Sequence, residues 1–403
     1  MIPDEWEIKS NDASKAFTPA APIDQTQLFA GRKAQLTSII DVINQKGQHA
    51  IIFGERGVGK TSLANEIARI PQHLALRVNA DSSDSFSSLW KKVFEGIVFT
   101  KDVEVAGFKQ EPRTETSSLM SQVPHKITTD VIRKTLIGLP IPTVIIIDEF
   151  DRITNTPVKS TMADTIKTLS DHSVNATIIL VGVADSVDQL IKEHQSIERA
   201  LVQVKMPRMS DDELGLIIDN GLKILNMSID ADARKHIILL SQGLPHYTHL
   251  LALNATRQAL SKHENNIRYN DVETAIVKAI QNAQQTTLSS YHKSISSPRK
   301  DNIFAQVLLA CALAHTDEMG YFAAADVRDS LSMIMGKKYE IPSYSRHLNE
   351  FCDPKRGPIL SKIGKKHSFR FRFVNPLMQP FITMQGFANR LIDQVQMEKL
   401  SNK

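Results

Sequence analysis

The sequence predicts an α/β fold that contains a parallel β-sheet. Three short apolar runs, at residues 50–53, 144–147 and 178–181, are each followed by a glycine or an aspartate. The run at 144–147 consists of four β-branched residues, which is typical of a strand buried on both faces of a parallel sheet. Residues 33–46, which precede the first of these runs, have the helical periodicity of an amphipathic helix and predict a helix before that strand.

The composition limits the class of protein. With 403 residues, 42% of them hydrophobic, the chain can bury two or three domain cores. A net charge of +4 means that contact with a polyanion requires a local basic patch. Two distant cysteines exclude a disulfide framework, and there is neither a secretory signal pattern nor an apolar run of membrane-spanning length. We therefore expect a cytoplasmic protein without membrane contact.

The run at 50–53 leads into Gly-Glu-Arg-Gly-Val-Gly-Lys-Thr, which has the spacing of a phosphate-binding loop. Glycines permit backbone angles that turn several N–H groups toward one anion. The next residues predict a helix whose N-terminus faces the same anion. Lys60 is expected to reach the β- and γ-phosphates and Thr61 to hold Mg²⁺. The residues predicted to bind ATP here are Gly54, Gly57, Val58, Gly59, Lys60, Thr61 and Ser62.

An acidic pair follows the run at 144–147. Asp148 would lie at the carboxyl end of its strand, where ligands bind in open α/β sheets, and can hold Mg²⁺ through water. Glu149 is then placed to orient and deprotonate an attacking water. The alternative is that the pair only ends the strand and caps the next helix. The phosphate-binding loop upstream favours the catalytic interpretation.

Two further residues extend the predicted site. Asp185 follows the run at 178–181 and could sense the γ-phosphate through the attacking water, or could instead cap a helix at 186–193. Arg199 precedes a fifth predicted strand at 201–205. A strand at 74–79 and a helix at 86–97 complete the pattern. Residues 99–122 are polar with weak periodicity, so we interpret them as an insertion or mobile loop and assign them no role.

These motifs resemble those of the AAA+ ATPases, and within them the replication-initiator (origin-recognition) group and its bacterial and archaeal relatives. The resemblance covers roughly residues 26–282 and rests on residues 54–61, 144–149, 182–185, Arg199 and 243–245. It implies a P-loop NTPase fold with a five-stranded parallel sheet and a small helical lid. It also implies self-association, with ATP bound between neighbouring subunits.

Three residues acquire roles from the resemblance alone. Phe29 and Arg32 lie in the segment that covers the adenine in that family. Arg199 matches the arginine finger, which stabilises charge on a neighbour's γ-phosphate. The alternative for Arg199 is an ordinary solvated charge.

The predicted lid contains four helices and begins after Ser210, which forms a capping-box pattern with Glu213. Gly243-Leu-Pro245 departs from the AAA+ pattern, in which an arginine opens this helix. The Gly-x-Pro form is similar to that of the signalling ATPases known as STAND, where the lid contacts the phosphate. His246 is therefore a candidate nucleotide contact.

The C-terminal segment predicts a separate module. The pattern predicts helices at residues 302–314, 323–335 and 342–351. It then predicts two strands around a turn at residues 359–374 and a final helix at residues 380–400. Three helices and a hairpin resemble a winged helix. Between Pro354 and Val374 there are seven lysines and arginines and no acidic residue, which is a plausible footprint for DNA phosphates. The residues expected to face a DNA groove are Ser343, Tyr344, Arg346 and His347.

The predicted organisation is an extended lead-in (1–25), the ATPase domain (26–208), the lid (209–283), a polar linker (284–300) and the winged-helix-like domain (301–403). The main hypothesis is an AAA+ protein that hydrolyses ATP slowly with Mg²⁺ and whose nucleotide state controls assembly and duplex-DNA binding. The alternative is a STAND-like switch whose C-terminal domain binds a protein partner. Glu149 argues against a scaffold that only binds nucleotide.

Overall fold

The computed structural model describes residues 5–22, 26–103, 113–184, 197–299, 301–365 and 368–401. The chain divides into two compact units. The first comprises Met1–Gly31, Glu55–Gly59 and Pro207–Lys403, and the second comprises Arg32–Gly54 and Lys60–Met206. None of the helices in this described part is both long and apolar enough to cross a bilayer.

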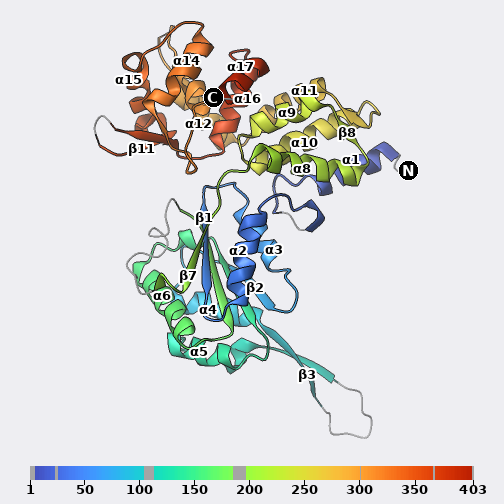
Figure 1. Ribbon diagram of the computed structural model, residues 1–403, viewed down its shortest axis with the longest axis vertical. Coiled ribbons are helices and arrows are strands. Elements are labelled where there is room, and N and C mark those ends of the chain that lie inside the picture. The colour runs from blue at the N-terminus through green and yellow to red at the C-terminus, as the bar shows by residue number, and fades with distance from the viewer. Residues whose placement is uncertain are drawn as a thin grey trace. The chain divides into compact units, whose positions relative to one another are not determined.

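The second unit contains the predicted sheet of five parallel strands (Figure 1). Its order is β2-β5-β6-β1-β7. The strands are β1 (His49–Gly54), β2 (Leu74–Asn79), β5 (Thr143–Asp148), β6 (Ala176–Val183) and β7 (Leu201–Lys205). In register, Asn79 lies opposite Asp148 and Gly54 opposite Val183, so the carboxyl ends of these strands meet at one edge of the sheet. The predicted fold class is therefore confirmed.

Helices cover both faces of this sheet (Figure 1). One layer contains α2 (Lys33–Asn44) and α3 (Lys60–Ile67), and the other contains α4 (Phe86–Gly96), α5 (Thr129–Ile137) and α6 (Thr156–Asp171). Residues of β1 and β5 are buried along their whole length because both faces are covered. On α4, Trp90 and Phe94 are fully buried, and the Ser85 side chain caps the helix by accepting the N–H of Ser88.

The prediction of a loop at residues 99–122 was wrong in part, because the described residues there form an antiparallel pair. β3 (Val98–Val103) pairs with β4 (Arg113–Ser118), and a 3₁₀ turn follows at Leu119–Gln122. Figure 1 shows this ribbon leaving the body of the unit. Its polar sequence lacks the apolar alternation of a half-buried strand, so periodicity could not predict it.

The first unit contains the four predicted lid helices: α8 (Asp211–Leu225), α9 (Ala231–Ser241), α10 (Pro245–Leu260) and α11 (Tyr269–Gln281). The capping box of α8 is present, since Ser210 and Glu213 exchange backbone–side-chain hydrogen bonds of 3.1 and 3.3 Å. Short strands β8 (Ser228–Ile229) and β9 (Asn266–Ile267) pair in parallel beside them.

The prediction of an extended lead-in at 1–25 was wrong for residues 5–16. These residues form α1 (Glu5–Ala16), which packs on α8 and α10 and is followed by the 3₁₀ turn Thr26–Leu28. Phe17, just after α1, is fully buried against Gly221, where a Cβ atom would lie 2.4 Å from its ring. Small residues such as Ala13 and Ala16 make the buried face of α1, so the sequence shows almost no apolar stripe.

The C-terminal part of the first unit has the helices and hairpin of a winged helix. Its elements are α13 (Phe304–Ala312), β10 (Phe322–Ala323), α14 (Val327–Met335), α15 (Ile341–Phe351), β11 (Leu360–Ile363), β12 (Arg370–Phe373), α16 (Met378–Ala388) and α17 (Gln394–Ser401). The three strands form a sheet in the order β10-β12-β11. One final helix was predicted, but a break occurs near Arg390, whose φ is 56°.

The predicted polar linker is also largely helical, as α12 (Gln285–Ile295). Tyr291 on this helix is 7% exposed and packs edge-on against Phe381 of α16, with ring centroids 5.7 Å apart. One buried aromatic residue per helix is too weak a signal to distinguish a helix from a Ser-rich linker.

Three buried histidines predict sensitivity to acid. Burial lowers the pKa values of His49, His236 and His249 from 6.5 to about 4, so the folded protein keeps them neutral where the unfolded chain protonates. Stability is then complete above about pH 6.5 and falls as the pH drops toward about 4, by up to about 1.4 kcal/mol per pH unit for each histidine. Urea unfolding across this range tests the prediction. His49→Gln should reduce the slope, and equal slopes in both proteins would contradict the assignment for His49.

Candidate functional site

The loop between β1 and α3 carries three glycines in conformations that side chains rarely adopt. The φ angle is 156° at Gly54, 87° at Gly57 and 93° at Gly59. A Cβ atom at Gly54 would lie 2.4 Å from the carbonyl oxygen of Met206, so the position also lacks room for a side chain. This backbone geometry is the one that a phosphate-binding loop requires.

The loop ends at the N-terminus of α3, where the predicted phosphate and metal ligands lie. Val58 is fully buried, and Lys60 is 8% exposed with its Nζ donating to the carbonyl oxygen of Gly54 at 3.0 Å. Thr61 and Ser62 occupy the first turn of the helix and are half-buried. The helix dipole and the ammonium group both favour an anion at this point.

Asp148 ends β5 and is 3% exposed. Its Oδ1 accepts the backbone N–H of Glu149 at 2.8 Å, and its Oδ2 accepts a hydrogen bond from Nη2 of Arg77 at 2.8 Å. Arg77 belongs to β2 and was not singled out from the sequence. The one available signal was a charged residue inside an otherwise apolar strand.

Glu149 adopts a left-handed backbone conformation, with φ 57° and ψ 32°. Its side chain is 48% exposed, and its Oε2 accepts a hydrogen bond from Arg152 at 2.9 Å. This hydrogen bond raises the pKa of Arg152. Asp151 accepts the N–H of Val183 at 2.8 Å and so ties the turn to the end of β6. The candidate base is therefore oriented at the carboxyl edge of the sheet, next to Asp148.

Asp185, together with its alternative role as a helix cap, lies outside the described residues. Arg199 is exposed in the turn before β7 and has no hydrogen bond or ion pair with any described residue. Leu201, two residues later, pairs with His49 at the start of β1. Arg199 thus lies near the amino edge of the sheet, about 17 Å along β1 from Gly54.

The residues expected around the adenine are placed as follows. Phe29 is half-buried in the first unit, and Arg32, in the second unit, is 2% exposed with φ 60° just before α2. His246 lies in the first turn of α10, and its Nδ1 is 2.7 Å from the carbonyl oxygen of Pro19. Burial lowers the pKa of His246, so its ring is neutral and donates to Pro19.

Within the first unit, the segment Glu55–Gly59 packs against the lid and the C-terminal domain. Glu55, 5% exposed, pairs with Arg208 at 2.8 Å, and Arg208 also donates to the carbonyl oxygen of Gln242 at 3.3 Å. A Cβ atom at Gly57 would lie 3.0 Å from Leu377 of the C-terminal domain. No local sequence signal predicts these contacts, because the partners are far apart in the chain.

The basic hairpin is only partly available to a ligand. Lys355, Lys362 and Lys365 are exposed, and Lys362 also donates to Asn349 at 3.0 Å. Arg370 is exposed but pairs with Asp317 at 3.1 Å, and Arg372 stacks on Tyr321 at 4.6 Å. Lys366 lies outside the described residues.

The prediction that Tyr344 faces a DNA groove was wrong. Tyr344 is fully buried and donates its hydroxyl to the carbonyl oxygen of Ala324 at 2.7 Å, because the apolar stripe of α15 points inward there. His347 is half-buried against Phe304, and only Ser343 and Arg346 of the predicted set are exposed.

Comparison with known proteins gives a family match over part of the chain. Residues 43–191 match the family described as an AAA domain. A search of curated proteins found no match. Among solved structures, the ORC2 protein of Aeropyrum pernix in ADPNP and ADP complexes has a TM-score of 0.50 at 13% identity, covering 97% of this chain and 98% of that one.

Two further solved structures are similar. The ORC1 protein of A. pernix in complex with DNA has a TM-score of 0.47 at 14% identity, covering 94% of this chain and 98% of that one. The Walker-type ATPase of Pyrococcus abyssi also has a TM-score of 0.47, at 13% identity, covering 90% and 98%. At 13% identity, the likeness to the ORC2 protein concerns the fold alone.

The side chains at the carboxyl edge of the sheet fit a magnesium nucleotide. A hydroxyl and a carboxylate are the hard oxygen ligands that Mg²⁺ prefers, and a glycine loop with a lysine suits the phosphates. The family match, this donor set and the sheet topology agree. Residues 43–191 therefore match an AAA domain and have the P-loop ATPase fold, which is also the fold of the ORC2 protein of A. pernix, and ATP and Mg²⁺ are the cofactors that this site takes.

Proposed function

We propose that this ATPase binds duplex DNA through its C-terminal winged helix, and that its nucleotide state controls assembly and DNA binding. The observation that carries the proposal is the set of exposed lysines on and beside the β11–β12 hairpin, Lys355, Lys362 and Lys365. Residues 354–374 contain no acidic side chain that would oppose a phosphate backbone. Such a hairpin binds a polyanion mainly through electrostatic contacts between its lysines and the phosphates.

In the proposed ATP site, Lys60 and the loop N–H groups bind the phosphates, and Thr61 and Asp148 hold Mg²⁺, which supplies charge neutralisation when bound. Glu149 accepts a proton from the attacking water. Arg152 holds the Glu149 carboxylate from the side at 2.9 Å and so limits the positions it can take.

Arg199 supports assembly through the nucleotide site. Its place near the amino edge of the sheet puts it beyond side-chain reach of the phosphate loop in its own chain. An exposed guanidinium in this position can instead reach the γ-phosphate held by a neighbouring copy, where it would stabilise charge in the transition state.

Removing the hairpin lysines should weaken DNA binding. The variant Lys355→Ala/Lys362→Ala/Lys365→Ala is expected to bind duplex DNA at least about tenfold more weakly at low salt. The slope of log K against log [salt] should fall by about 0.9 for each lost phosphate contact. Fluorescence anisotropy across a salt series measures both quantities. The matched control removes three exposed lysines of the other unit, Lys33, Lys46 and Lys167. If the two triple variants bind duplex DNA with equal affinity, the hairpin is not the DNA-binding surface.

Nucleotide control is tested with the Glu149→Gln protein, which should retain ATP. Its DNA affinity is measured with and without ATP. Tighter, salt-sensitive binding with ATP supports the proposal. An absence of DNA binding at low salt would favour the second candidate function.

That second candidate is a STAND-like switch that binds a protein partner. The observation that favours it is the contact of the C-terminal domain with the phosphate loop inside the first unit. Leu377 lies against Gly57, and its carbonyl oxygen accepts the hydroxyl of Tyr247 on α10 at 2.7 Å. A domain packed in this way could be held or released according to the nucleotide bound.

A further inference from the structure

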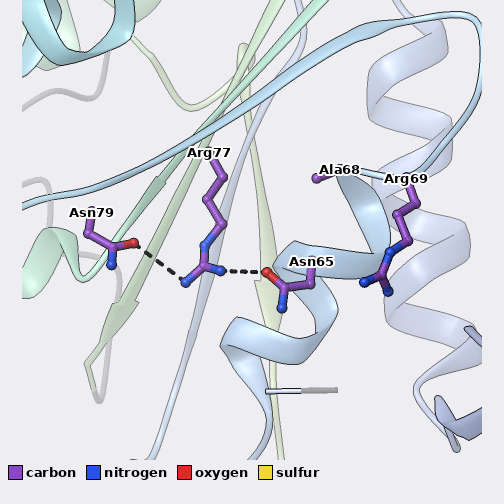
Figure 2. A pocket seen from close by; sticks show the side chains of 5 residues that line it. All are labelled: Asn65, Ala68, Arg69, Arg77 and Asn79. Carbon is purple, nitrogen blue, oxygen red and sulfur yellow. Dashed lines mark hydrogen bonds between the residues drawn. The ribbon is translucent and has the colours of Figure 1, made fainter. Parts of the chain in front are cut away.

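Within the second unit, the guanidinium of Arg77 contacts side chains from three elements near the phosphate loop. Figure 2 shows its guanidinium between the side chains of Asn65 and Asn79. Nη1 donates to Oδ1 of Asn65 at 2.5 Å, and Nη2 donates to Oδ2 of Asp148 at 2.8 Å and lies 3.4 Å from Oδ1 of Asn79. One planar group thus contacts β2, α3 and the end of β5.

The Asp148 carboxylate is held at both oxygens. Arg77 supplies the partner of Oδ2, and the N–H of Glu149 supplies that of Oδ1. The carboxylate is 4% exposed and Arg77 is 24% exposed, so this ion pair is largely withdrawn from solvent. A buried charge requires such a partner, and a fixed partner also fixes the orientation of the carboxylate.

The contact with Asn65 connects this carboxylate to the phosphate loop. Asn65 lies on α3, the same short helix that begins with Lys60 and Thr61. Arg77 therefore bonds at one end to the helix that carries the Thr61 hydroxyl and at the other end to Asp148. Its rigid fork sets the spacing between the two, which a single ammonium group could not do.

We propose that Arg77 is a positioning residue for Mg²⁺ binding, which keeps Asp148 aligned with Thr61 through Asn65. The inference rests on the proposed magnesium-holding role of Thr61 and Asp148, and it does not depend on DNA being the partner. Side chains that orient metal ligands in this way typically change metal affinity by about 10–100-fold when removed.

The same surface offers a matched control. An open polar pocket of about 630 Å³ is lined by Asn65, Ala68, Arg69, Arg77 and Asn79. Arg69, in the turn after α3, contributes a second guanidinium to this pocket, but its ion-pair partner is Glu66 of α3 at 3.3 Å rather than Asp148. Arg69→Met removes an arginine from the pocket without touching the bond to Asp148.

The experiment measures binding of a fluorescent ATP analogue to the full chain, first in excess EDTA and then with increasing Mg²⁺. Arg77→Met should leave Mg²⁺-free binding unchanged and raise the Mg²⁺ concentration at half-effect by about tenfold. Asn65→Ala, which keeps the ion pair but removes its anchor on α3, should raise it by a smaller factor than Arg77→Met does. Arg69→Met should match the wild type.

Each outcome decides the proposal. An unchanged Mg²⁺ midpoint in Arg77→Met, a lower one, or an equal shift in Arg69→Met would overturn it. A wild-type Mg²⁺ midpoint in Asn65→Ala would also overturn the proposal. This second variant therefore still tests the proposal if Arg77→Met does not fold. Asp148→Asn separates the two assignments. If Asp148→Asn leaves the Mg²⁺ midpoint unchanged, Asp148 does not hold the metal. If Asp148→Asn shifts the midpoint and the Arg77 and Asn65 variants do not, Asp148 keeps its metal role and only the positioning role of Arg77 is wrong.

Discussion

Replacing Lys60 with alanine is expected to abolish ATP binding. The ammonium group is the buried cation of the phosphate loop, 8% exposed and 3.0 Å from the carbonyl oxygen of Gly54. Hydrogen bonds to charged groups contribute about 1.5–3 kcal/mol each, so the loss of two phosphate contacts corresponds to an affinity at least about 100-fold lower. Titration with a fluorescent ATP analogue measures the change.

The control for this variant is Lys46→Ala, which removes an exposed lysine from the same unit. It should bind ATP as the wild type does. Because the Lys60 side chain is also part of the packing around the loop, the thermal unfolding midpoint of both variants should be compared without nucleotide. A folded Lys60→Ala protein with ordinary ATP affinity would mean that the loop does not bind phosphates.

Glu149→Gln should leave ATP binding intact and reduce hydrolysis by about 10²–10⁴-fold, the usual contribution of a general base. Glutamine has the shape of glutamate and can still accept the hydrogen bond from Arg152, so the turn should keep its conformation. Its amide cannot take a proton from water. Single-turnover release of phosphate, measured beside ATP affinity, separates the two effects.

Glu95→Gln is a suitable control, because Glu95 is an exposed glutamate on α4 with a weak ion pair to Lys91 at 3.8 Å. Its hydrolysis rate should equal that of the wild type. If Glu149→Gln turned over ATP at the normal rate, Glu149 would lose its assignment as the base.

The sheet and its loop could be predicted because their sequence signals are local. Continuous β-branched runs identify strands covered on both faces, as in β5, and the glycines of the phosphate loop mark angles closed to other residues. The positions of Asp148 and Glu149 could be predicted from that strand, since a residue at the end of a parallel strand lies at the carboxyl edge of the sheet.

What the sequence missed depends on partners distant in the chain or on weak periodicity. Arg77 and Asp148 are separated by 71 positions, and nothing local to either predicts the bond. The inward orientation of Tyr344 depends on which face of α15 packs against the domain. Helix α1 buries mainly alanines, and so its amphipathic pattern is faint.

The contact between Leu377 and Gly57 has a thermodynamic consequence. The segment Glu55–Gly59 shares its packing with the C-terminal domain, so any ligand that shifts this segment must also change the free energy of that packing. Coupling of this kind is reciprocal: whatever factor ATP applies to a partner's affinity for the C-terminal domain, that partner applies to the affinity for ATP. If a partner binds the proposed C-terminal module, the nucleotide affinity should therefore differ between the free protein and that complex.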